Sequence, residues 1–201
     1  MTIVRLPGGG LLVHSPTPLR DGLADAVAAL GPVRVLVAPS LEHHVSAGAW
    51  HARFPEATLW GAPGLRRKQP GLAIGATFDE VVPPWAETFT PLALGGCPAL
   101  NEVVFFHAAS GTLLCSDLLF NIRAPEGWAT KLVLTVMGTN GRLAMSRMWR
   151  RYGRDRPALR ASLEQMLAWK FTRLLPGHGD VFEAPDAPAA CRAALAWAFE
   201  A

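Results

Sequence analysis

The sequence predicts an α/β protein arranged as an αββα sandwich, in which two mixed β-sheets are flanked by helices. Two observations lead to this prediction. Apolar runs of strand length and segments of helical periodicity interleave along the whole chain, which is typical of α/β proteins. Histidine and aspartate residues stand where predicted strands end, and α/β folds concentrate their functional sites at such ends.

The bulk composition predicts one soluble domain. The chain has 201 residues, half of them hydrophobic, and no linker, repeat or low-complexity tract divides it, so we expect a single domain over 1–201. Three cysteines (Cys97, Cys115 and Cys191) show no disulfide spacing, which favours a reducing compartment. No apolar run reaches the roughly 18 residues of a membrane span. We therefore expect a cytoplasmic protein that does not associate with membranes.

Residues 2–53 are predicted to form a hairpin, a helix, a strand and a second helix. Short apolar runs at 2–6 and 10–14, joined by a Pro-Gly-Gly turn, predict a hairpin. Leucine and valine at helical spacing predict a helix over 19–30. A buried strand at 33–38 and a helix at 44–53 follow, so the polar segment between them is a strand-to-helix turn.

The later elements alternate in the same way, except over 121–142, which has no clear period. Strands are predicted at 57–60, near 80–82, at 88–94, 102–107 and 112–116, and within FTRLLPG. Helices are predicted at 143–152, 157–170 and 186–199.

Three short motifs lie at the C-terminal ends of predicted strands: LEHH (41–44), SGTLLCSDLLFN (110–121) and RLLPGHGDVF (173–182). Asp117 lies between apolar runs, where an ionised carboxylate is costly unless it is paired or bound to a metal. His178 lies between two glycines, which let the backbone turn sharply and present the imidazole. Taken alone, each residue is equally consistent with a turn cap or a tolerated loop residue.

Together, the motifs resemble those of the metallo-β-lactamase superfamily. In that superfamily a strand ends in a THxHxDHxGG-type turn, a later strand ends in Asp before a Leu/Phe pair, and a final strand ends in PGHG. LLCSDLLF and LLPGHGDV match the last two patterns, and the resemblance extends from Ile3 to Phe182. It implies the αββα fold and a metal-dependent site.

The first motif departs from the family pattern. Aligned without gaps, it places Pro39 and Leu41 at the first two metal-binding histidines, His43 at the Asp, and His44 at the third histidine. The family's middle histidine falls in GGCPA, where Cys97 is a candidate soft ligand. The chain therefore resembles a poorly characterised branch of unknown function that has a Pro-x-x-x-His-His turn in place of HxHxDH.

The resemblance implies that one of the two metal positions is retained. Its ligands are His43, His44, Asp117 and His178. Three nitrogens and one oxygen suit tetrahedral Zn²⁺, or Fe or Mn with added water. The family's other metal position lacks its ligands, so any metal chemistry is mononuclear.

Three functional hypotheses follow. In the first, the metal lowers the pKa of a bound water that attacks a small ester, lactone, thioester or phosphoester, and His14 or Asp180 assists proton transfer. In the second, which the lost ligands favour, the chain is a non-catalytic descendant that serves as a binding or scaffold module. In the third, a mononuclear iron carries out redox or oxygen chemistry.

The segment RMWRRYGRDR (147–156) invites a nucleic-acid interpretation, because it interleaves Trp149 and Tyr152 with five arginines. The commoner explanation is a helix whose arginines extend over apolar surface. A formal charge of +3 over 201 residues also provides little counterion release. We expect a small-molecule substrate and no specific nucleic-acid binding.

Overall fold

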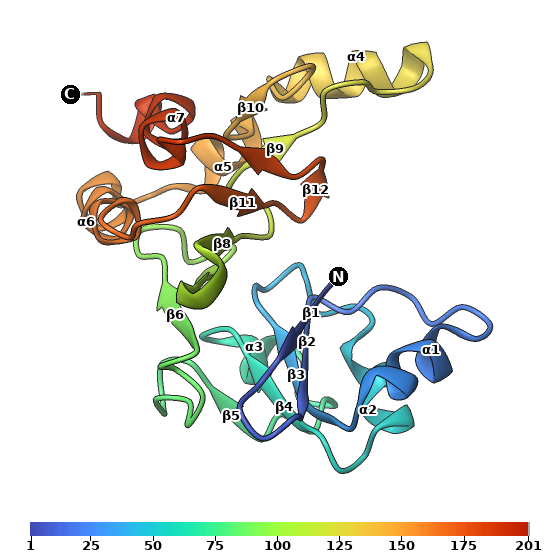
Figure 1. Cartoon of the computed structure of the whole chain (residues 1–201). Helices are drawn as coiled ribbons and strands as arrows, with labels where there is room; N and C mark the ends of the chain where they lie inside the picture. Colours follow the sequence, from blue (N-terminus) through green and yellow to red (C-terminus); the bar gives the residue numbers. More distant parts are fainter. Residues whose placement is uncertain (201) are drawn as a thin grey trace. The chain divides into compact units, whose positions relative to one another are not determined.

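The computed structural model describes residues 1–200, and its elements form two compact units (Figure 1). Unit 1 comprises Met1–Thr88, and unit 2 begins at Phe89. No helix within residues 1–200 is both long enough and apolar enough to cross a membrane. That residues 1–201 form a single domain stays a prediction.

Unit 1 contains a five-stranded mixed sheet with the order β1-β2-β3-β4-β5. The strands are β1 (Thr2–Arg5), β2 (Leu11–His14), β3 (Val33–Ala38), β4 (Thr58–Gly61) and β5 (Ala76–Thr77). The helices are α1 (Leu23–Leu30), α2 (Ala47–Arg53) and α3 (Leu65–Lys68). β1 and β2 form the predicted antiparallel hairpin, and β2 to β5 are parallel. The loops that follow β2 and β3 therefore leave the sheet at the same edge.

The core of unit 1 lies between the sheet and its helices. Side chains alternate along a strand, so Leu11 and Val13 of β2 point to one face, where they join Leu36 of β3 and Trp50 of α2. Trp50 is fully buried, and its indole Nε1 donates to the carbonyl of Thr17 at 2.7 Å. This bond ties the loop after β2 to α2.

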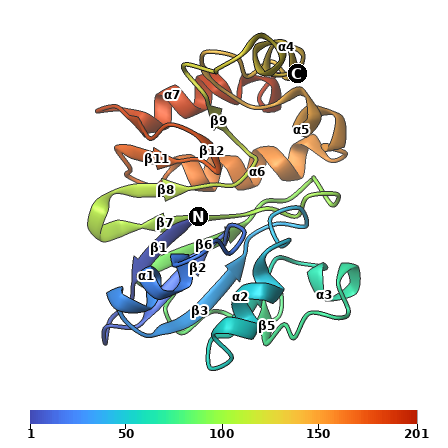
Figure 2. The same cartoon turned by 90° about the vertical axis from the view of Figure 1, so that its right-hand side faces the viewer.

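Unit 2 contains two further mixed sheets. The larger has the order β13-β11-β8-β7-β6, and the smaller has the order β10-β9-β12. The larger sheet consists of β6 (Phe89–Ala93), β7 (Val103–His107), β8 (Thr112–Leu114), β11 (Arg173–Leu175) and β13 (Phe182–Glu183). The smaller consists of β9 (Phe120–Asn121), β10 (Leu143–Ala144) and β12 (His178–Gly179). Figure 2 shows β7 and β8 side by side, and β8 is parallel to β11.

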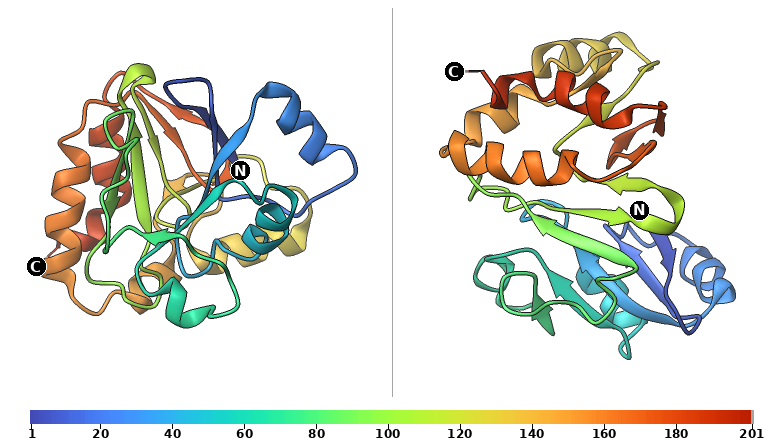
Figure 3. Two further views of the ribbon diagram at one scale, coloured as in Figure 1. Left: turned by 90° about the horizontal axis from the view of Figure 1, so that it is seen from below. Right: turned by 60° about the vertical axis from the view of Figure 1, so that its left-hand side comes forward.

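Side chains cap three of the α-helices of unit 2, those that begin at Arg147, Arg156 and Ala187. The α-helices of this unit are α4 (Trp128–Met137), α5 (Arg147–Tyr152), α6 (Arg156–Leu167) and α7 (Ala187–Ala194), with short 3₁₀ turns at Ala108–Ser110 and Ala196–Ala198. Ser146 accepts a hydrogen bond from the Trp149 amide, and Asp155 accepts one from the Ala158 amide. The helices α6 and α7 pack side by side (Figure 3), and Leu163 lies in the core that they share with the larger sheet.

Several predicted boundaries were wrong. The strand near 80–82 does not form, because Pro83 and Pro84 follow it and Val82 is exposed, and β5 forms earlier in the chain. The helix predicted at 19–30 begins only after Gly22, which adopts a left-handed conformation with φ 75°. The helix predicted at 143–152 begins only after the Ser146 cap, and strand β10 precedes it.

Structural contacts occupy part of the arginine-rich segment 147–156. Trp149 is buried in the core, the guanidinium of Arg156 lies 4.8 Å from the Trp197 ring centroid, and Arg147 donates to a last-turn carbonyl of α4 at 3.0 Å. The absence of nucleic-acid binding stays a prediction.

Candidate metal centre

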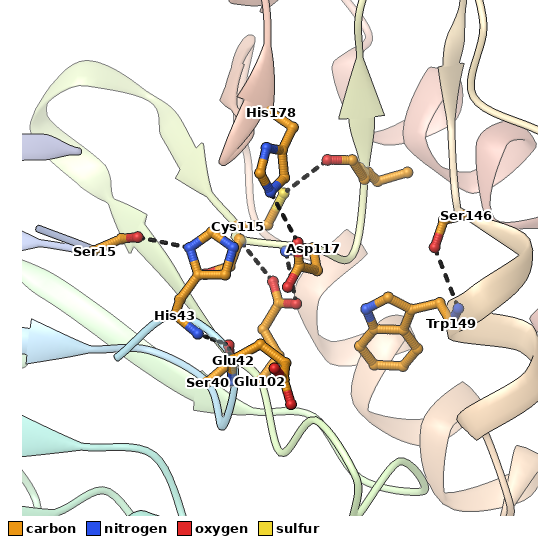
Figure 4. A network of polar contacts seen from close by, with 12 residues as sticks. Ser15, Ser40, Glu42, His43, Glu102, Cys115, Asp117, Ser146, Trp149 and His178 are labelled. Atoms are coloured by element: carbon orange, nitrogen blue, oxygen red, sulfur yellow. Dashed lines mark hydrogen bonds and ion pairs between the residues drawn. The ribbon is translucent and has the colours of Figure 1, made fainter. Parts of the chain in front are cut away.

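The clearest candidate site in unit 2 is the pair Asp117 and His178. Asp117 lies in the turn after β8 and is nearly buried, whereas His178 lies on β12 and has a half-exposed side chain. Nε2 of His178 is 3.2 Å from Oδ1 of Asp117 (Figure 4). The imidazole also stacks on the Phe120 ring, with 5.0 Å between centroids and 9° between planes. The ring plane is therefore fixed from one side and its edge faces the carboxylate.

The two glycines around His178 allow its loop to approach its neighbours closely. A Cβ placed on Gly177 would lie 2.6 Å from the Ser116 carbonyl oxygen, and a Cβ on Gly179 would lie 2.3 Å from the Asn121 carbonyl oxygen. Gly179 also has φ 103°, which L side chains rarely adopt. The two glycines of the PGHG motif thus have a steric cause: a Cβ at either position would overlap a neighbouring backbone carbonyl.

The Asp117 turn is held by a residue that the sequence analysis missed. Glu102 is fully buried, and its two carboxylate oxygens accept hydrogen bonds from the backbone amides of Ser116 at 2.6 Å and Asp117 at 3.0 Å. A carboxylate placed directly before the apolar run VVFF was a usable sequence signal, because burying it requires donors.

In unit 1, the LEHH segment forms a turn after β3. The Ser40 hydroxyl accepts hydrogen bonds from the amides of Glu42 at 3.2 Å and His43 at 3.0 Å, which closes the turn. Nδ1 of His43 lies 2.7 Å from the hydroxyl of Ser15, which follows β2 and has φ 50°. With Nδ1 engaged in this way, Nε2 is the ring nitrogen that His43 can offer to a metal.

The other predicted histidines lie in the same unit. His14, at the end of β2, is buried, and burial first and the neighbouring His43 second lower its pKa to about 3. His44 is half-buried; burial and then Lys68 lower its pKa as well. Among the described residues, no hydrogen-bond partner reaches Nδ1 of His44. The lowered pKa values of both rings favour the neutral imidazole, which is the form that binds a metal.

Asp180 and Cys97 differ sharply in environment. Asp180 is exposed beside β12, where Oδ2 accepts the Arg123 amide at 3.4 Å and the backbone carbonyl accepts Asn121 Nδ2 at 2.9 Å. Cys97 is buried in the apolar core of unit 2, and burial raises the pKa of its thiol to about 11. Because thiolates rather than thiols bind metals, this environment disfavours Cys97 as a ligand.

The profile of a domain of unknown function, DUF4336, matches residues 1–132, which is more than half of the chain. The chain belongs to the DUF4336 family. No curated protein matches the sequence of this DUF4336 chain.

Solved structures show the fold of the DUF4336 chain. It is similar to a metallo-β-lactamase from Pontibacter korlensis, with a TM-score of 0.64 and 12% identity over 99% of this chain and 86% of the other. It is also similar to DIM-1 metallo-β-lactamase, with a TM-score of 0.62 and 14% identity over 98% of this chain and 85% of the other. For rubredoxin oxygen:oxidoreductase from Desulfovibrio gigas the TM-score is 0.63 and the identity 13%, over 98% of this chain but only 52% of the other. The predicted α/β sandwich of mixed sheets flanked by helices is therefore confirmed.

Proposed function

We propose that this DUF4336 chain binds one divalent metal ion through His43, Asp117 and His178, with His44 as a fourth candidate ligand, and acts as a metal-dependent hydrolase. The substrate is a small ester, lactone, thioester or phosphoester. The observation that carries the proposal is the 3.2 Å separation of the Asp117 and His178 donor atoms. In this view the His-His turn is a reduced form of the superfamily's HxHxDH turn.

The donor set fits a metal. Two atoms bound to a tetrahedral Zn²⁺ at about 2.0–2.1 Å lie about 3.3–3.4 Å apart, which is close to the separation of the Asp117 and His178 donors. In this proposal His43 supplies a third donor through Nε2, because Ser15 engages its Nδ1. Zn²⁺ is the first choice, with Fe²⁺ and Mn²⁺ as alternatives.

An ion held there supplies Lewis-acid chemistry, because it polarises a carbonyl or phosphoryl oxygen and acidifies water. The other residues have roles that their environments define. His14, which is neutral at pH 7, can orient a substrate or a ligand by hydrogen bonding without contributing charge. Asp180, an exposed carboxylate two residues beyond His178, is the candidate proton acceptor.

The proposal is tested by elemental analysis of untagged protein, followed by Zn²⁺ titration and a hydrolysis screen over the four ester classes. We expect about one ion per chain in the wild type and in the control His51→Gln, and loss of the ion in Asp117→Asn and His178→Gln. Hydrolysis should follow metal content. Wild type that takes up no Zn²⁺, Mn²⁺ or Fe²⁺ would refute the metal site.

Two observations favour other functions for the same site. Pro39 and Leu41 stand where the superfamily binds its other ion, which favours a binding or scaffold module; metal uptake without turnover of any substrate class would support that role. The similarity to rubredoxin oxygen:oxidoreductase favours iron chemistry, for which oxygen consumption by Fe²⁺-loaded but not Zn²⁺-loaded protein is the test.

A further inference from the structure

We infer that Glu102 is a positioning residue: its buried carboxylate fixes the peptide that carries Asp117 and so sets the direction in which Asp117 meets His178. The inference rests on the proposed metal-binding function, because it assigns a role to Glu102 in ligand geometry. Glu102 itself is not proposed as a ligand.

The contact is bidentate and spans consecutive residues. Oε1 of Glu102 accepts the Ser116 amide at 2.6 Å, and Oε2 accepts the Asp117 amide at 3.0 Å. Each carboxylate oxygen therefore holds one peptide plane, and two fixed planes determine the backbone dihedrals at Ser116. These dihedrals place the N–Cα bond of Asp117, so the Asp117 φ is the one backbone dihedral left to set the direction of its Cα–Cβ bond.

The same peptide is held from the opposite side by the segment that carries His178. The carbonyl of Ser116 accepts the Gly177 amide at 3.1 Å, and the Cys115 amide donates to the Leu175 carbonyl at 3.1 Å. The Ser116 unit thus connects Glu102 to the loop of His178. Releasing it from Glu102 removes a restraint on the turn that presents Asp117 to His178, whose donor atoms lie 3.2 Å apart.

Burying the Glu102 carboxylate costs free energy unless hydrogen-bond donors hold it. A fully buried carboxylate loses its hydration, and the loss is offset only by strong, well-aligned donors. Two charge-assisted bonds to consecutive amides provide these donors, and both amides belong to the turn that presents Asp117. Residues that orient metal ligands typically change affinity 10- to 100-fold when they are replaced.

The test compares Glu102→Gln with a matched control. Glutamine keeps the volume of Glu102 but presents an NH₂ donor to one of the two amide donors, so one bond is replaced by repulsion. The control is Ser162→Ala: the Ser162 hydroxyl, also buried in unit 2, accepts the Gly95 amide at 3.1 Å. Both substitutions remove a buried bond from a side chain to the backbone, but only Glu102 touches the Asp117 turn.

The measurements are the Zn²⁺ dissociation constant, by competition with a chromophoric chelator, and the absorption spectrum of the Co²⁺-loaded protein. We expect Glu102→Gln to weaken Zn²⁺ binding about 10- to 100-fold and to change the Co²⁺ spectrum, while Ser162→Ala stays within about twofold of wild type. If Glu102→Gln fails to fold, Glu102→Asp, which keeps the charge but retracts it, replaces it with the same expectation.

The outcomes separate the two claims. Wild type that binds no ion overturns the proposed function and this inference together. Wild type that binds Zn²⁺ while the Glu102 variant binds it equally well overturns the inference alone. Equal weakening in Ser162→Ala also overturns it, because the effect would then reflect general loss of packing in unit 2.

Discussion

Replacing Gly177 by alanine should separate the two best-placed donors without changing either. A Cβ at this position would lie 2.6 Å from the Ser116 carbonyl oxygen, whereas ordinary contact begins at 3.4 Å. The loop and the Ser116 turn must therefore move apart by about 0.8 Å to relieve the overlap. If that movement passes to the side chains, the 3.2 Å separation of Asp117 and His178 widens to about 4 Å. Two ligands of one tetrahedral ion span only about 3.3–3.4 Å.

We expect Gly177→Ala to bind Zn²⁺ at least 10-fold more weakly than wild type and to lose about 1–3 kcal/mol of unfolding free energy from overpacking. Gly71→Ala is the control, since a Cβ there meets nothing within 4 Å and Gly71 does not have a positive φ. The assays are chelator competition for Zn²⁺ and urea unfolding of the metal-free protein. Wild-type affinity in Gly177→Ala would show that the close approach of the two turns is irrelevant to the site.

Three further predictions follow from individual environments. His14 has a pKa of about 3 when folded and about 6.5 when unfolded, so the unfolded state binds more protons and the metal-free protein should lose about 3 kcal/mol of unfolding free energy between pH 7 and pH 4. In His14→Gln that part of the urea-monitored pH dependence should disappear; an unchanged slope would contradict the assignment. Cys97 and the other two cysteines are buried with raised thiol pKa values, so a thiol reagent at pH 8 should modify none of them before denaturation and all three after it. Ser15→Ala should weaken Zn²⁺ binding about 10-fold by freeing the His43 ring, and unaltered affinity would show that the 2.7 Å contact does not orient it.

The sequence predicted those parts of the fold in which burial follows a regular period. The strand β3 was predicted with its observed ends, because nearly all of Val33–Ala38 is buried and apolar. The helix α4 was not predicted, because its apolar side chains do not define a buried face: Trp128 is 80% exposed and Val136 63%, while Leu134 is buried. Periodicity detects a helix through the face that it buries, and this helix buries almost none.

The candidate site, like the fold, was only partly predictable from the sequence. Side chains that offer metal-binding atoms could be selected as candidates because their chemistry is rare at strand ends, and the structure places Asp117 beside His178. The contacts of the residues that hold them could not be predicted in this way, although a carboxylate directly before an apolar run was a signal for Glu102. Glu102 acts across 14 and 15 residues through backbone amides, which look the same at every position of a sequence. Ser15 acts across 28 residues through one hydroxyl.

A metal ligand and a residue that holds a turn differ in how easily another residue can replace them. A ligand can be replaced by another donor: the proposed alignment puts His43 where the metallo-β-lactamase pattern has an aspartate, and such an exchange keeps a donor atom while it removes one negative charge. A residue that holds a turn has no such equivalent, because its oxygens must meet two particular amides at 2.6 and 3.0 Å. Had the turn lost its function, the fully buried Glu102 carboxylate would be a cost that an apolar side chain avoids. Its presence in this chain therefore favours a working Asp117 turn over a relic.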